Sequence, residues 1–100
     1  MKLLITPRAK LDLLEIRDYI EIELLNKSAA ENTIATITKR LRALIDFPMM
    51  GASLSSIIDI ETDYRFLVCG KYNAFYRLDD ETVYIIRILY GRRDFVKILF

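Results

Sequence analysis

The chain has 100 residues, of which 53% are apolar and 29% are charged, and its formal net charge is +1. This length suits one domain with one small core, and the apolar fraction excludes a disordered chain. Histidine is absent and Cys69 is the only cysteine, which excludes Ser-His-Asp and Cys-His hydrolases and an internal disulfide. We therefore interpret residues 1–100 as a single domain and expect no metal and no cofactor.

The N-terminal quarter predicts a short strand followed by an amphipathic helix. Leu3–Ile5 is an apolar run, and Thr6 and Pro7 suit the N-cap and the first helical position. The helix is expected to end near Leu25. Its apolar stripe recurs at steps of three and four residues and consists of Ala9, Leu13, Ile16, Ile20 and Leu24.

A second amphipathic helix follows a break at Asn26-Lys27. Ser28 and Glu31 have the spacing of a capping box, in which each side chain accepts an amide of the first helical turn. The helix is expected to end near Phe47-Pro48. Its apolar face consists of Ala30, Ile34, Ile37, Leu41 and Leu44. Two such helices with a short connection form an antiparallel hairpin, which needs a sheet to bury its stripes.

The remainder predicts a loop and then a three-stranded meander. Residues 49–62 are interpreted as a loop with a short strand at Ile57-Ile58. Gly70-Lys71 fits a two-residue turn. The three strands are expected at Tyr64–Cys69, Tyr72–Leu78 and Thr82 to Leu89 or Tyr90.

The predicted order is therefore β-α-α-β-β-β. This is an α+β domain in which an antiparallel helix hairpin covers one face of a small, mostly antiparallel sheet. The opposite face is expected to be half solvated and to carry arginines and tyrosines. Guanidinium groups bind phosphate and tyrosine rings stack on bases, although the same residues are also ordinary occupants of an open sheet face.

Basic side chains are concentrated in the second part of the chain. Residues 1–63 carry 8 basic and 10 acidic side chains, whereas residues 64–100 carry 7 and 4. An anionic partner would relieve the repulsion within this excess. The candidate binding residues for a target or a nucleic acid are Arg65, Tyr90, Arg92 and Arg93. Asp94 is expected to form a structural ion pair with one of the two adjacent arginines.

The C-terminal tail is apolar, with its side chains at helical spacing. Two interpretations remain open: the tail packs on the core, or it leaves an apolar strip that a partner peptide covers. The residues concerned are Phe95, Ile98, Leu99 and Phe100.

At this point the sequence resembles the RelE/ParE toxin superfamily, and most closely its ParE-like plasmid-stabilisation branch. The resemblance runs along nearly the whole chain and depends on an ordered set of segments. These segments are 13–20 in the first helix, 44–51 after the second helix, and 64–68, 72–77 and 87–94 in the strands.

The resemblance implies a toxin of a type II toxin–antitoxin system. RelE-like members cut messenger RNA on the ribosome, and ParE-like members poison DNA gyrase by binding. Both are neutralised by a small antitoxin that wraps the toxin, and its expected contacts here are the C-terminal residues Phe95, Ile98, Leu99 and Phe100. The complex often represses its own operon, so contact with operator DNA is expected only through the antitoxin. Arg65, Tyr90 and Arg93 match the positions that a RelE-like nuclease would use.

Two departures from the nuclease pattern favour the gyrase inhibitor over the enzyme. Leu67 and Asn73 occupy positions where further basic residues are expected. Tyr90 stands where relatives often have histidine, and with an ordinary pKa near 10 tyrosine is a poor base at neutral pH. We therefore expect a toxin that is not an enzyme. A ribosome-dependent endoribonuclease and a non-toxic relic that binds only antitoxin or operator remain as alternatives.

A cytoplasmic location is expected. The sequence has neither the run of about 20 apolar residues that a spanning helix needs nor the apolar core of a signal peptide. The expected partners are a cognate antitoxin and either gyrase or the ribosome with its message. Contact with a membrane is not expected.

Overall fold

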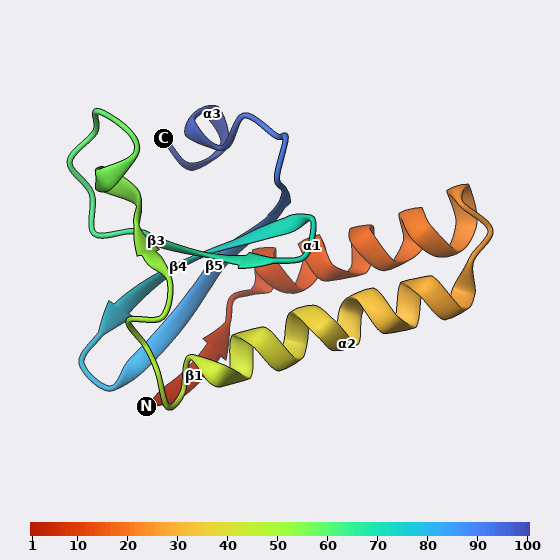
Figure 1. Cartoon of the computed structure of the whole chain (residues 1–100), viewed down its shortest axis with the longest axis horizontal. Coiled ribbons are helices and arrows are strands. Elements are labelled where there is room, and N and C mark those ends of the chain that lie inside the picture. Colours follow the sequence, from red (N-terminus) through yellow and green to blue (C-terminus); the bar gives the residue numbers. More distant parts are fainter.

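The computed structural model describes residues 1–100 and contains a five-stranded sheet with two long helices on one face (Figure 1). The sheet order is β1-β5-β4-β3-β2, in which β1 runs parallel to β5 and the other neighbours are antiparallel. The predicted α+β fold is thus confirmed. The strands are β1 (Lys2–Ile5), β2 (Ala52–Ser53), β3 (Arg65–Cys69), β4 (Tyr72–Asp79) and β5 (Thr82–Tyr90).

The helix hairpin begins as the sequence predicts. Thr6 caps α1 (Pro7–Asp18) by accepting the Ala9 amide at 3.2 Å, and Pro7 occupies its first position. The helical path then continues as a π-helix, η1 (Tyr19–Glu23), before the turn to α2 (Lys27–Ala43). No helix has the length and apolar character needed to cross a membrane.

The predicted capping box of α2 is wrong. Asn26 is the N-cap, and its side-chain oxygen accepts the Ala29 amide at 2.9 Å. Because the helix already begins at Lys27, Ser28 and Glu31 lie inside it. The break at Asn26-Lys27 was identified correctly, but the capping role was given to the wrong residue.

Replacing Asn26 by alanine should therefore lower the free energy of unfolding by about 1 kcal/mol, because one amide of the first turn loses its acceptor. Ser28→Ala serves as the matched control and should change stability by less than about 0.5 kcal/mol. Urea denaturation of both variants measures the difference. A larger loss for Ser28→Ala than for Asn26→Ala would contradict the assigned cap.

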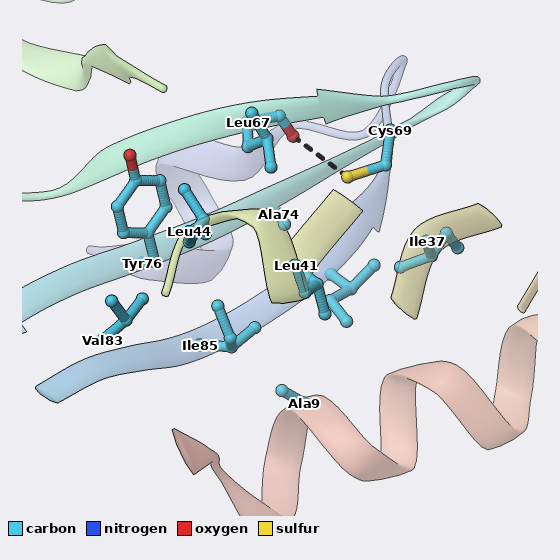
Figure 2. Packing of buried hydrophobic residues seen from close by; sticks show 11 residues of the cluster. Ala9, Ile37, Leu41, Leu44, Leu67, Cys69, Ala74, Tyr76, Val83 and Ile85 are labelled. Atoms are coloured by element: carbon cyan, nitrogen blue, oxygen red, sulfur yellow. Dashed lines mark hydrogen bonds between the residues drawn. The ribbon is translucent and has the colours of Figure 1, made fainter. Parts of the chain in front are cut away.

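The main core lies between the hairpin and the sheet (Figure 2). The stripe of α2 contributes Ile37, Leu41 and Leu44, which are fully buried. The sheet contributes one face of each long strand, including Leu67, Ala74, Tyr76, Val83 and Ile85. This packing explains why the two amphipathic stripes were readable from the sequence.

The expectation of a half-solvated second sheet face is wrong. A smaller core covers that face and is built on Leu54, Phe75 and Leu89. Its cover comes from the segment around η2 (Leu54–Ser56) and from a C-terminal helix, α3 (Phe95–Leu99). The Phe95 ring packs on Phe75 with its centroid 5.2 Å away. The C-terminal tail therefore packs on the protein itself.

The segment after α2 differs from its prediction as well. Ile57-Ile58 forms no strand. Instead Ala52–Ser53 forms the edge strand β2, opposite Phe66 and Arg65 of β3. Ile58 packs against the second core and Ile57 is exposed. Of these two adjacent β-branched residues, only Ile58 thus contributes to the second core, and neither joins the sheet.

Candidate functional site: the groove between the helix hairpin and the sheet

A groove of about 870 Å³ lies between the distal half of the helix hairpin and one end of the sheet. The hairpin lines it with Ile16, Tyr19, Ile20, Leu24, Thr33 and Thr36. The sheet end lines it with Cys69, Lys71, Tyr72, Ile88, Tyr90 and Arg93. The groove is therefore mainly apolar and has cationic groups at one end.

The turn after β5 brings the cations to this groove. The Gly91 amide donates to the carbonyl of Lys71 at 2.8 Å, and the Arg93 amide donates to the carbonyl of Tyr90 at 2.9 Å. Arg93 lines the groove and Arg92 does not. Lys71, Arg92 and Arg93 are exposed and form no ion pair, so their charges remain available to an anionic partner.

Two tyrosines line the groove beside these cations. Tyr72 and Tyr90 are cross-strand partners, and their ring centroids are 5.8 Å apart. Burial raises the pKa of Tyr72, and its neighbours Tyr90 and Tyr19 raise it further. Tyr72 therefore stays protonated at neutral pH and offers a ring face and a hydroxyl group, but no base.

Cys69 also lines the groove without offering a nucleophile. Burial raises the pKa of its thiol to about 11, against a smaller opposing effect of Arg40. The Sγ atom points to the Leu67 carbonyl at 3.6 Å (Figure 2). Because the thiolate is the reactive form, this cysteine is chemically quiet at neutral pH.

Arg65 does not join Tyr90 and Arg93. Arg65 pairs with Tyr76 in the β3–β4 register, whereas Cys69 and Tyr90 both pair with Tyr72. Arg65 and Cys69 are four residues apart along β3, so Arg65 lies about 13 Å along the sheet from the row that contains Tyr90. The Arg65 guanidinium donates to the carbonyls of Met49, at 3.2 Å, and Gly51. The structure thus assigns this arginine to the loop after α2.

The predicted ion pair of Asp94 is wrong. Its carboxylate makes no salt bridge; it caps α3 and accepts the Lys97 amide at 3.4 Å. An acidic side chain at a helix N-terminus is stabilised by the unpaired amides there. Arg92 and Arg93 therefore lack the intramolecular partner that the sequence suggested for one of them.

The four candidate antitoxin contacts lie on the face of the sheet opposite the helix hairpin. Phe95, Ile98 and Leu99 are partly buried against the second core. Phe100 is half exposed and its ring meets Tyr64 edge to face at 5.7 Å. Of these four side chains, only Phe100 offers substantial surface to a partner.

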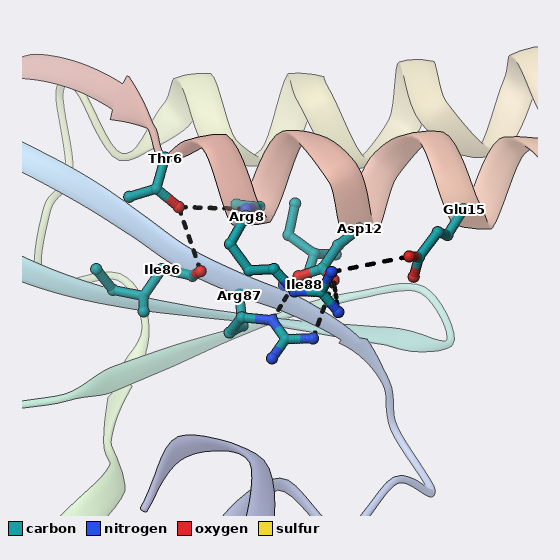
Figure 3. A network of polar contacts seen from close by, with 8 residues as sticks. Thr6, Arg8, Asp12, Glu15, Ile86, Arg87 and Ile88 are labelled. Atoms are coloured by element: carbon teal, nitrogen blue, oxygen red, sulfur yellow. Dashed lines mark hydrogen bonds and ion pairs between the residues drawn. The ribbon is translucent and has the colours of Figure 1, made fainter.

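Sequence reasoning missed a buried carboxylate beside the groove (Figure 3). Asp12 is 3% exposed, and its oxygens accept from Arg87 Nε at 2.9 Å, Arg87 Nη2 at 3.1 Å and the Ile88 amide at 2.9 Å. Arg8 approaches the same carboxylate at 3.6 Å. One signal was available: Asp12 is three residues from Ala9 and four from Ile16, within the apolar stripe.

The Asp12 contacts are possible because, beyond Ile85, β5 has a strand neighbour only on its β4 side. Strand β1 ends at Ile5, opposite Ile85. Strand β5 also has a bulge there, because Tyr76 faces Ile85 while Phe75 faces Arg87. Thr6 and Asp12 then bond the exposed edge, at the Ile86 carbonyl and the Ile88 amide. This edge leads directly to Tyr90, so α1 positions the sheet end of the groove.

Comparison with known proteins first gives the class of fold. A solved structure described as "Chromosomal ParDE TA system from P. aeruginosa" matches with a TM-score of 0.76 over 90% of this chain and 95% of that chain, at 24% sequence identity. The fold is thus RelE/ParE-like. Comparison with curated proteins gives no match.

The sequence then gives the family. Residues 3–95 match the family described as "ParE toxin of type II toxin-antitoxin system, parDE". The chain belongs to the ParE toxin family, and the resemblance found from its motifs is confirmed. Membership implies a toxin with a cognate antitoxin.

Proposed function

We propose that this toxin inhibits DNA gyrase by binding it and has no nuclease activity. One observation carries the choice: Arg65, the proposed phosphate-binding residue of a nuclease, lies about 13 Å along the sheet from Tyr90 and is hydrogen-bonded to loop carbonyls. Cleavage of RNA requires a base and cations around one phosphate. Tyr90 and Arg93 share the groove, but the chain supplies no histidine as a base beside them.

The groove serves this function as a recognition surface. Apolar walls provide contact area, and the unpaired charges of Arg92, Arg93 and Lys71 provide orientation toward an anionic surface. Tyr90 lines the groove, is 44% exposed and adds a ring of the type enriched in binding hot spots. The activity is expected in the cytoplasm, where gyrase and ribosomes are found.

The antitoxin is proposed to neutralise the toxin by filling the same groove. An amphipathic segment would place its apolar face between the hairpin and the sheet and its carboxylates near Arg93 and Lys71. Phe100 adds a further exposed contact for the same chain. A short reading frame that encodes such a segment is expected next to the gene, and its absence there would weaken this proposal.

Purified toxin should inhibit gyrase supercoiling at micromolar concentration and leave ribosome-bound message intact. Arg93→Ala and Tyr90→Ala should each weaken inhibition at least about tenfold, the size of a modest hot spot. Lys10→Ala is the control, because this exposed lysine lies on α1 outside the groove.

Three other outcomes would overturn the proposal. Message cleavage that depends on Arg65, Tyr90 and Arg93 would establish the endoribonuclease instead. Arrest of growth without either effect would point to another target. Unaffected growth of bacteria that express the toxin without antitoxin would identify a non-toxic protein that binds only antitoxin or operator.

A further inference from the structure

The turn that follows α2 exposes large apolar side chains. Phe47 and Met49 are 65% and 62% exposed, and Met50 is 38% exposed. The Met50 amide donates to the Phe47 carbonyl at 3.0 Å and closes the turn. Figure 1 places this segment, the Phe47–Met50 turn, beside the N-terminus and away from the α1–α2 connection that borders the groove.

The backbone of the Phe47–Met50 turn is held by buried side chains of the sheet. Tyr76, which is fully buried, donates its hydroxyl to the Pro48 carbonyl at 2.8 Å and accepts the Gly51 amide at 3.0 Å. Arg65 binds the carbonyls on either side of Met50. Such a turn loses little conformational entropy on binding, because its backbone is already ordered. The two methionines keep flexible side chains that adapt to an apolar pocket.

The segment of the chain that leads into the turn is cationic. Lys39, Arg40 and Arg42 lie near the end of α2, and none of them forms an ion pair. Arg40 donates to the Val68 carbonyl and to Met50 Sδ, both uncharged, so its charge is not neutralised. Asp46 is the only carboxylate among residues 39–50. A complementary partner therefore carries an excess of acidic groups around its apolar contact.

We propose that the Phe47–Met50 turn is a second contact for the protein that the toxin inhibits, and that this target offers an apolar pocket rimmed by carboxylates. The inference rests on the proposed function, since it concerns the target of the toxin. It also gives Arg65 an indirect role, because this arginine shapes the turn from the sheet side.

A second copy of the chain fits the turn poorly. A symmetric contact through the turn brings the cationic groups of two copies, including Arg40 and Arg42, near each other, and like charges across an interface are unfavourable. Three partly exposed side chains also supply far less than the roughly 800 Å² per partner of a stable interface. A larger, acidic partner that also binds the groove avoids this repulsion and supplies the missing contact area.

The test separates toxicity from antitoxin binding. The double variant Phe47→Ser/Met49→Ser removes only exposed side chains, so its thermal unfolding should match that of the wild type. Its inhibition of gyrase should weaken at least about tenfold, and cells that express it should resume growth. Its affinity for the purified cognate antitoxin should stay within about twofold. Ile57→Ser/Ile60→Ser is the matched control, with two exposed isoleucines outside the turn and the groove, and should remain fully toxic.

Each other outcome overturns the inference in a recognisable way. A toxic wild type with an equally toxic Phe47→Ser/Met49→Ser variant removes the turn from the target interface and leaves the proposed function intact. Loss of antitoxin binding by that variant assigns the turn to the antitoxin. A wild-type dimer in sedimentation that the variant abolishes assigns it to a second copy. A wild type without toxicity rejects the proposed function, and the inference with it.

Discussion

Asp12→Ala is expected to lower the free energy of unfolding by about 3–5 kcal/mol, because it leaves the positive charge of Arg87 buried without a partner. The Arg87 side chain is only 14% exposed and donates two hydrogen bonds to this carboxylate. The Ile88 amide loses its acceptor in the same step. Urea denaturation of the purified variant measures the change.

Asp18→Ala is the matched control, on the same helix. Asp18 pairs with Arg17 at 3.2 Å, but both side chains are about half exposed, and such a pair contributes at most about 1 kcal/mol. The double variant Asp12→Ala/Arg87→Ala should lose less than the two single losses together, since it removes both charges. A loss below 1 kcal/mol for Asp12→Ala would show that the buried pair is not a stabilising contact between α1 and β5.

Gly51→Ala should destabilise the protein by about 3 kcal/mol, as overpacking at a site that does not yield. A Cβ atom at this position would lie 2.5 Å from the Phe66 carbonyl oxygen and 2.6 Å from the Tyr76 hydroxyl oxygen. The first belongs to the backbone of β3 and the second to a fully buried ring. Relief of the clash must therefore break the hydrogen bonds between Tyr76 and the loop. Thermal unfolding and limited proteolysis after residue 47 report the two effects.

Gly70→Ala distinguishes this clash from the general cost of replacing a glycine. Gly70 has φ of +62° and open space around it, so alanine there costs only the left-handed backbone, about 1–2 kcal/mol. Gly51 has the opposite problem, a crowded site without a positive φ. Equal losses for the two variants would contradict the assigned packing of the loop.

The helix hairpin was predictable because its signals are local. The stripes on α1 and α2 repeat with the helical period, and Thr6 and Pro7 mark the start of α1 in adjacent positions. The cap of α2 shows the limit of this reasoning. Asn26 and Ser28 are both residue types favoured at N-caps. The helix begins at Lys27, so Asn26 is the cap.

The sorting of side chains in β5 was not predictable, because a bulge interrupts strand alternation. Strict alternation along this strand would place Arg87 with Val83, Ile85 and Leu89 on one face, opposite Ile88. In the structure Val83, Ile85 and Ile88 share the main core and Leu89 joins the second core. The bulge lies where β1 stops, and Asp12 binds the edge of β5 just beyond it. No short window of the sequence contains both partners of these contacts.

The residues of the candidate site were also predictable only in part. Tyr90 and Arg93 were identified from their place at the end of a strand, and both line the groove. Arg65 was grouped with them because of its charge and the family resemblance, but the register places it opposite Tyr76, where it binds the loop after α2.

By itself the sequence determined the α+β class, the helix hairpin, the order of the main strands and the toxin family, because periodicity, caps and ordered motifs act over short stretches. Only the tertiary structure decided which arginines are free. Arg87 pairs with Asp12, and Arg65 donates hydrogen bonds to loop carbonyls. Arg92 and Arg93 have no ion-pair partner, because Asp94 caps α3 instead. Arg87 and Asp12 are 75 residues apart in the sequence, and only the folded chain brings them into contact.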